Sequence, residues 1–186
     1  MPDRTMRVAS VNTSPGTIIE WRGRRVLTGI FKRPVIDRVD VRREGLVGDR
    51  QGDLTVHGGE LKAVYSYSTA NYEWWNLQLG HVLPYGMFGE NLTIDGLDEE
   101  TVAIGDRFTI GSTTLEAVQP RLPCYKLGIR FGDQAMVKRF MQSGRFGTYF
   151  RVVTEGNVGV GDEVRLVSHD PLAAPIVSLV RQRTGQ

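Results

Sequence analysis

The sequence has one cysteine, almost no net charge and no long apolar run. A single cysteine cannot form a disulfide within the chain, which favours a reducing compartment. The net charge of +2 over 186 residues argues against a general nucleic-acid binder but allows a local basic pocket. No apolar run approaches the roughly 20 residues that cross a bilayer, and the N-terminus has no secretory h-region. We therefore expect a cytoplasmic protein with neither nucleic-acid polymers nor membranes as partners.

Several chemical signatures are also missing. The three histidines (His57, His81 and His169) are too dispersed for a zinc signature, and no C-x₂-C pair occurs. There is no P-loop, no dinucleotide-binding G-x-G-x-x-G and no nucleophile elbow. A catalytic triad of residues far apart in the sequence stays open.

What the sequence does contain is 22 evenly spread glycines among short β-branched runs, which is typical of strands joined by tight turns. Hydrophobic residues make up 40% and charged residues 24%, as in ordinary globular proteins. Arg22-Gly23-Arg24 predicts a hairpin turn. Gly-Asp pairs predict turns that enter strands at Asp106 and Asp162. Strands are expected at residues 7–11, 17–21, 26–31, 35–42, 61–67, 91–94, 108–110 and 164–166.

Two helices are predicted, at residues 70–79 and 133–143. The first has Tyr72, Trp75 and Leu79 at helical spacing, with Thr69 as its N-cap. The second has an apolar side and a basic side, and Gly144 ends it. A short third helix could follow Pro175. The pattern predicts a β-barrel or sandwich with peripheral helices: one domain over residues 1–168, then a tail or helix over 169–186.

Three stretches could carry chemistry, and each has a plain structural alternative. Glycines around Asp49 and Arg50, with His57, Gly58, Gly59 and Lys62, could form an anion-binding nest, or only a solvated loop. Asn91, beside Glu90, could read the edge of a pterin, or only cap a turn.

The third stretch runs from Gln119 to Lys126. Its two prolines favour extended backbone, and if that continues, Cys124 and Lys126 share a face where the lysine favours the thiolate. The alternative is a buried apolar cysteine.

Taken together, these stretches resemble the MOSC family, named for the C-terminal domain of molybdenum cofactor sulfurase, and are most similar to its stand-alone bacterial members. Eight of them occur in the family's order over residues 14–162. They are Glu20-Trp21-Arg22-Gly23, Ile30-Phe31-Lys32-Arg33-Pro34-Val35, Gly48-Asp49-Arg50-Gln51, Val56-His57-Gly58-Gly59, Lys62-Ala63-Val64-Tyr65, Phe88-Gly89-Glu90-Asn91-Leu92, Ile104-Gly105-Asp106-Arg107 and Gln119-Pro120-Arg121-Leu122-Pro123-Cys124.

The resemblance implies a mainly β fold, a MOSC-type barrel related to the barrel domain of pyruvate kinase, with a few peripheral helices. It also implies a molybdenum cofactor (molybdopterin) whose metal is ligated by Cys124, with Asn91 near the pterin. We assign the phosphate of that cofactor to Arg50, His57, Gly58, Gly59 and Lys62. A family association with pyridoxal phosphate is a further expectation. Longer relatives have a helical extension after the barrel, so any partner docking by that extension is in doubt here.

The family is associated with reduction of N-hydroxylated bases, so we expect a molybdenum-dependent reductase of such small molecules. Cys124 is the metal ligand, and Glu90 or Asp49 would deliver protons. One cysteine cannot hold an iron–sulfur cluster, and a separate reductase is therefore expected, with Arg121 or Lys126, both at the cofactor, close to the electron path. The alternatives are a sulfur-transfer protein with a persulfide on Cys124, or a non-enzymatic cofactor carrier.

Overall fold

The computed structural model describes residues 5–52 and 59–184. Its helices are α1 (Thr69–Leu79), α2 (Tyr125–Phe131), α3 (Ala135–Ser143) and α4 (Ile176–Thr184), with a 3₁₀ turn, η1 (Glu60–Lys62). The strands are β1 (Met6–Thr13), β2 (Thr17–Trp21), β3 (Arg24–Thr28), β4 (Arg33–Val35), β5 (Val39–Arg42), β6 (Gly45–Leu46), β7 (Val64–Ser68), β8 (Leu92–Asp95), β9 (Arg107–Ile110), β10 (Thr113–Pro120), β11 (Thr148–Thr154), β12 (Gly156–Val158) and β13 (Glu163–Ser168).

A closed barrel lies at the centre of the fold. Within the described residues, seven strands pair in the order β13, β9, β10, β11, β7, β8 and β1, and β1 pairs back to β13. The pairs are antiparallel except β7 with β8, which are parallel and are connected through α1. Closure removes the unpaired edges of the sheet. The expected mainly β barrel with a few peripheral helices is confirmed.

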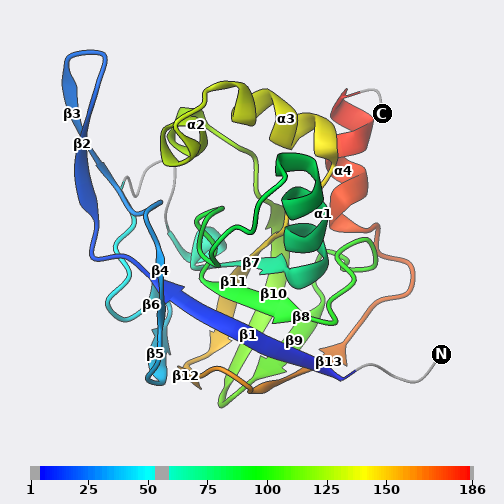
Figure 1. Ribbon diagram of the computed structural model, residues 1–186. Helices are drawn as coiled ribbons and strands as arrows, with labels where there is room; N and C mark the ends of the chain where they lie inside the picture. The colour runs from blue at the N-terminus through cyan, green and yellow to red at the C-terminus, as the bar shows by residue number, and fades with distance from the viewer. Residues whose placement is uncertain (1–4, 53–58, 185–186) are drawn as a thin grey trace.

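Smaller elements flank the barrel. β4 extends the sheet beyond β1, and β5, β6 and β12 form a three-stranded sheet of their own. β2 and β3 pair with each other and project as an arm, while the helices lie together at one side of the barrel (Figure 1). No helix in the described part of the chain is long and apolar enough to span a bilayer.

The apolar side chains divide between the inside of the barrel and the layer under the helices. Strand β7 shows why, because it is buried on both faces. Val64 packs in the barrel core, whereas Tyr65 and Tyr67 alternate to the opposite face and pack with Trp75 and Phe140 of the helical layer. This double burial fixes Tyr65 at the boundary where the site lies.

The helix predictions were right in type and close in their bounds. Helix α1 begins at Thr69, and its N-cap is Ser68, not Thr69, because the Ser68 hydroxyl accepts from the Asn71 N–H at 3.2 Å. Helix α3 begins at Ala135, two residues after the predicted start. Helix α4 follows Pro175, and its Ile176 packs into the barrel core. A division of the chain at residue 168 stays a prediction.

Some strand predictions were wrong. The expected strand over 35–42 is interrupted between Val35 and Val39, and residues 61–67 begin as the turn η1 before β7 starts. Strand β3 ends at Thr28, three residues early. The sequence pattern missed β10, β11 and α2. The Gly-Asp turns are present, since the carboxylates of Asp106 and Asp162 each accept a nearby backbone N–H at 2.9 Å.

Candidate functional site

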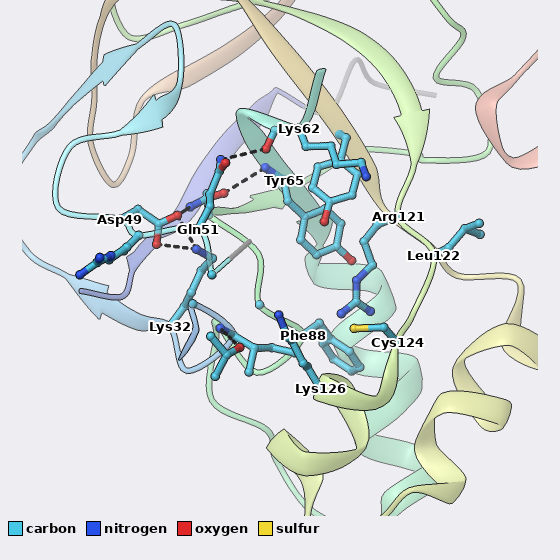
Figure 2. A pocket seen from close by; sticks show the side chains of 18 residues that line it. Lys32, Asp49, Gln51, Lys62, Tyr65, Phe88, Arg121, Leu122, Cys124 and Lys126 are labelled. Atoms are coloured by element: carbon cyan, nitrogen blue, oxygen red, sulfur yellow. Dashed lines mark hydrogen bonds and ion pairs between the residues drawn. The ribbon is translucent and has the colours of Figure 1, made fainter. Parts of the chain in front are cut away.

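A cavity opens between the base of the arm, the loop that holds residues 48–52, and the segment that leads from β10 into α2 (Figure 2). Among the described residues, its lining contains five basic side chains and one carboxylate, that of Asp49. Such an excess of positive charge favours an anionic ligand. The lining residues are Thr28, Gly29, Ile30, Lys32, Asp49, Arg50, Gln51, Gly52, Lys62, Tyr65, Phe88, Gly89, Asn91, Arg121, Leu122, Cys124, Lys126 and Tyr149.

Asp49 is held from several sides, and the structure argues against its predicted role in proton delivery. Lys32 donates to both carboxylate oxygens, the Ser14 N–H donates to Oδ1 at 2.9 Å, and the Asn91 amide donates to Oδ2 at 2.8 Å. These four hydrogen bonds fill the roughly four lone-pair sites of a carboxylate. Burial lowers the pKa of Lys32, although Asp49 beside it acts in the opposite direction. Asp49 therefore organises the cavity floor.

Asn91 lines the cavity, but its amide is already used by the protein. Its Nδ2 donates to Asp49 and, at 3.4 Å, to the Asn12 carbonyl, while its Oδ1 accepts from the Tyr65 N–H at 3.1 Å. An amide has two N–H donors, so both are spent. The expectation that Asn91 offers donors to a pterin edge is corrected: it ties β7 to the Asp49 loop.

Glu90 lies behind the cavity wall and is wholly buried. Its Oε1 accepts from the Tyr72 hydroxyl at 2.5 Å, from the Gly86 N–H at 2.6 Å and from the Thr93 hydroxyl at 2.9 Å. Burial raises the pKa of this carboxyl, against the effect of the hydrogen bonds. The prediction of Glu90 as a proton donor to substrate is wrong, because the side chain does not reach the cavity.

Cys124 lies at the cavity with its sulfur directed inward (Figure 2). The residue is extended (φ −130°, ψ 176°) and partly exposed, and α2 begins immediately after it at Tyr125. The predicted extended run through Lys126 is therefore wrong, because the segment turns into helix after the cysteine. Lys126 nevertheless lines the same cavity and is 7% exposed.

Arg121 is a buried cation at the cavity, with 5% of its surface exposed. Its guanidinium lies 5.6 Å from the ring centroid of Tyr65 and 5.0 Å from that of Phe140, and it donates to Tyr149. Burial raises the pKa of Tyr149, so this phenol is neutral. Within the described residues, the buried Nη1 of Arg121 has no hydrogen-bond partner. A buried donor without a partner is costly and calls for an explanation such as a ligand.

The loop predicted as an anion nest contributes only in part. Arg50 and Lys62 line the cavity, but Gly59 does not, and its N–H donates to the Gln51 side chain at 3.2 Å. Gln51 also donates to the Lys62 carbonyl, so it braces the loop. His57 and Gly58 lie outside the described residues.

Among the lining residues to which sequence reasoning assigned no role, Lys32, Tyr65 and Tyr149 carry polar groups into the wall of the cavity. Lys32 belonged to a motif already noted, and its position inside an apolar run was the signal for a buried role. Tyr149 pairs in register with Tyr65, so it would follow once β11 is placed beside β7. The strand itself gave no clear signal.

Comparisons with known proteins point to one family. A family model described as the MOSC domain matches residues 53–165. Bacillus subtilis YflK is 42% identical over 90% of this chain and 76% of its own length, and Escherichia coli YiiM is 35% identical over 67% and 57%. A Gibberella moniliformis protein named reductase is 32% identical over 82% of this chain, which spans 29% of that protein.

Solved structures give the same result for the fold. The crystal structure of Geobacillus stearothermophilus YiiM matches with a TM-score of 0.78 and 31% identity, covering 96% of this chain and 83% of the other. Escherichia coli YiiM matches with a TM-score of 0.69 and 24% identity, covering 94% and 76%.

Proposed function

This chain belongs to the MOSC domain family, and from that premise we propose that it is a molybdenum-cofactor-dependent reductase of N-hydroxylated compounds. The observation that carries the proposal is the neighbourhood of Cys124: one accessible thiol and a buried arginine with an unsatisfied Nη1 line the same basic cavity. The name of the Gibberella relative, a reductase, supports the reaction class.

The donor set fits the cofactor. A thiolate is the soft type of ligand that suits molybdenum alongside dithiolene sulfurs. Asp49, the carboxylate among the described lining residues, is saturated by groups of the protein itself, so the remaining cations can face an anionic ligand. When bound, the cofactor would supply two-electron chemistry that accepts the oxygen of an N–O bond.

The residues then have distinct roles. Cys124 would ligate the metal, and Arg121, Arg50 and Lys62 would bind the anionic part of the cofactor. Lys32, Asp49 and Asn91 hold the cavity floor and do not touch the reacting atoms. Tyr65 and Phe88 give the wall an apolar surface that limits the access of water.

The reaction balances as R–NHOH + 2 e⁻ + 2 H⁺ → R–NH₂ + H₂O, so two protons must reach the bond that breaks. Asp49 and Glu90 cannot provide them, for the reasons given above. Lys126 and Tyr149 both line the cavity, and neither side chain donates a hydrogen bond to another described residue. We assign proton delivery to these two groups. The electrons come from a separate reductase.

The test is protein made in a host that synthesises the cofactor, assayed with 6-hydroxylaminopurine. We expect stoichiometric molybdenum and pterin, and turnover with an artificial reductant but not with NADPH alone. Turnover by metal-free protein would contradict the proposal. A persulfide on Cys124 in metal-free protein, found by mass spectrometry without any turnover, would favour the sulfur-transfer alternative, and bound cofactor without turnover would favour a carrier.

A further inference from the structure

The arm formed by β2 and β3 stands apart from the barrel but is tied to the site. Its strands pair with each other and with no other described strand, and it projects beside α2 (Figure 1). A ribbon of two strands is only marginally stable by itself. Near its tip, Trp21 stacks on Tyr125, with ring centroids 5.3 Å apart and planes at 18°. Because Tyr125 directly follows Cys124, the stack holds the tip beside the edge of the cavity.

The turn at the tip is strained. Trp21 pairs with Arg24, which leaves Arg22 and Gly23 as a two-residue loop with φ of 52° and 72°. Positive φ at both positions matches the type I′ turn, for which Asn-Gly or Gly-Gly is usual. Arg22 is the one non-glycine residue with positive φ among the described residues. The Arg22 guanidinium lies 5.6 Å from the ring centroid of Trp21, so its charge is held at the tip beside the stacked rings.

The arm brings three arginines close together in the sequence. Arg22, Arg24 and Arg25 are exposed, and no ion pair joins any of them to a carboxylate in the described part of the chain. The single acidic residue of the arm is Glu20, opposite Arg25. Six arginines elsewhere on the surface pair with carboxylates, namely Arg38, Arg42, Arg107, Arg151, Arg165 and Arg181. Arg7 and Arg43 are exposed without an ion pair among the described residues, but they lie apart from each other and from the arm. The arm thus presents three positive charges against one negative charge.

We propose that this arm is the docking element for the electron donor, a flavoprotein with an acidic surface around its flavin. The inference rests on the proposed function, whose reaction consumes two electrons. A reduced flavin delivers two electrons, and an acidic face complements the arm. Arg121 and Lys126, expected near the electron path, are 5% and 7% exposed, so they offer a partner little surface. Among the described residues, the arm adds three exposed arginines beside this mouth, next to the exposed Arg50 of the lining.

The first test measures binding without turnover. Metal-free protein is titrated with oxidised flavodoxin, a small acidic flavoprotein, at low and at physiological ionic strength. The triple variant Arg22→Glu, Arg24→Glu, Arg25→Glu should raise the Kd at least about tenfold and flatten its dependence on salt. The matched control reverses Arg7, Arg43 and Lys138, three exposed basic residues on other elements, with the same change of net charge. An equal loss in both variants, or in neither, overturns the proposal.

The second test separates docking from chemistry. With cofactor-loaded protein, the arm variant should raise the KM for reduced flavodoxin at least about tenfold, and should not lower turnover driven by methyl viologen. Binding through the arm without turnover by any reductant would support the docking surface and contradict the proposed function. If turnover with flavodoxin has the same KM in the arm variant as in the wild type, the docking surface alone would be overturned. The docking surface would also be overturned if a DNA duplex bound through the arm at physiological salt while the binding of flavodoxin did not depend on the arm.

Discussion

At the scale of single residues, the cavity separates side chains that hold the protein from side chains that face a ligand. Asp49 and Asn91 have their hydrogen-bonding capacity filled from within, whereas Arg121 keeps an unsatisfied donor and Cys124 keeps a partly exposed thiol. Residue type alone does not make this distinction, because both groups are polar and line the same space. The hydrogen bonds of each side chain make this distinction.

The first prediction concerns ligation by Cys124. Cys124→Ser should leave the fold intact, because it removes no disulfide and changes little volume, while tight molybdenum binding is lost because a hydroxyl is a poor soft ligand. The measurement is metal content beside circular dichroism and Tm. Cys124→Ala is the companion variant, and it should behave in the same way. Full metal content in both would identify another group as the ligand.

The second prediction concerns the buried ion pair. Lys32→Met leaves the Asp49 carboxylate, with a side chain 4% exposed, without its counter-charge, so we expect a loss of about 3–5 kcal/mol in the free energy of unfolding. The control is Arg42→Met, whose exposed pair with Asp40 should be worth less than about 1 kcal/mol. Urea denaturation measures both. Similar effects in the two variants would mean that the buried pair has no special structural role.

At the scale of elements, the sequence predicted those whose pattern is local. Strand β2 and the turn at Arg22-Gly23 follow from alternation and turn chemistry, and α1 and α3 follow from apolar spacing. Helix α2 was missed because seven residues after a Pro-Cys pair are too few to show a helical period. Strands β10 and β11 were missed because their burial depends on barrel partners far away in the sequence.

The same limit applies to the site. The order of short motifs led to Cys124, Arg121, Arg50, Lys62 and Asn91 in one cavity. The saturation of Asp49 could not be predicted, because its donors, Ser14, Lys32 and Asn91, come from three separated segments. Nor could the burial of Glu90, which lies in a loop between the lining residues Gly89 and Asn91 and whose hydrogen bonds to Tyr72, Gly86 and Thr93 hold it behind the wall.

The third prediction concerns how two segments of the cavity wall approach each other. A Cβ on Gly29 would lie 2.1 Å from the Arg50 carbonyl, and one on Gly52 would lie 2.3 Å from the Leu27 carbonyl. Neither glycine has a positive φ, so the constraint is the closeness of the two backbones. Gly29→Ala and Gly52→Ala should each destabilise by roughly 1–3 kcal/mol and displace Arg50, weakening cofactor binding.

The control for this prediction is Gly161→Ala, where the added Cβ meets open space and only the positive φ of 87° opposes it. That variant should lose roughly 1–2 kcal/mol and keep its cofactor. Denaturation and molybdenum content are measured together. Unaltered cofactor binding in Gly29→Ala and Gly52→Ala would show that the close approach does not shape the cavity.

At the scale of the whole molecule, a net charge of +2 conceals two cavities of opposite character. The basic cavity holds the candidate site. A second cavity, at the start of α1, is lined by Glu73, Asp98, Glu99 and Glu100, with Arg145 as its basic residue among those described. The net charge sums over both cavities. It therefore argued against a general polyanion binder but located neither cavity.

The last prediction follows from Glu99 in the second cavity. Its side chain is 8% exposed and bridges three elements by accepting from the Ser68 N–H, the Asn71 amide and the Gly147 N–H. Burial raises the pKa of Glu99 to about 7, against these hydrogen bonds. Below pH 4.5 the carboxyl is protonated in both the folded and the unfolded chain. Between pH 4.5 and about 7 the unfolded chain loses its proton first, so ionisation favours unfolding there.

The free energy of unfolding should therefore fall by roughly 3 kcal/mol as the pH rises through this window, at about 1.4 kcal/mol per unit of pKa difference. The raised pKa of Glu90 acts in the same direction, whereas Asp162, whose pKa is lowered by Arg38, acts only below about pH 4. Glu99→Gln should flatten most of the slope, and Glu100→Gln, an exposed control, should not. Urea denaturation from pH 5 to 8 measures this. A wild-type stability that rises with pH, unchanged by Glu99→Gln, would mean that Glu99 is ionised throughout.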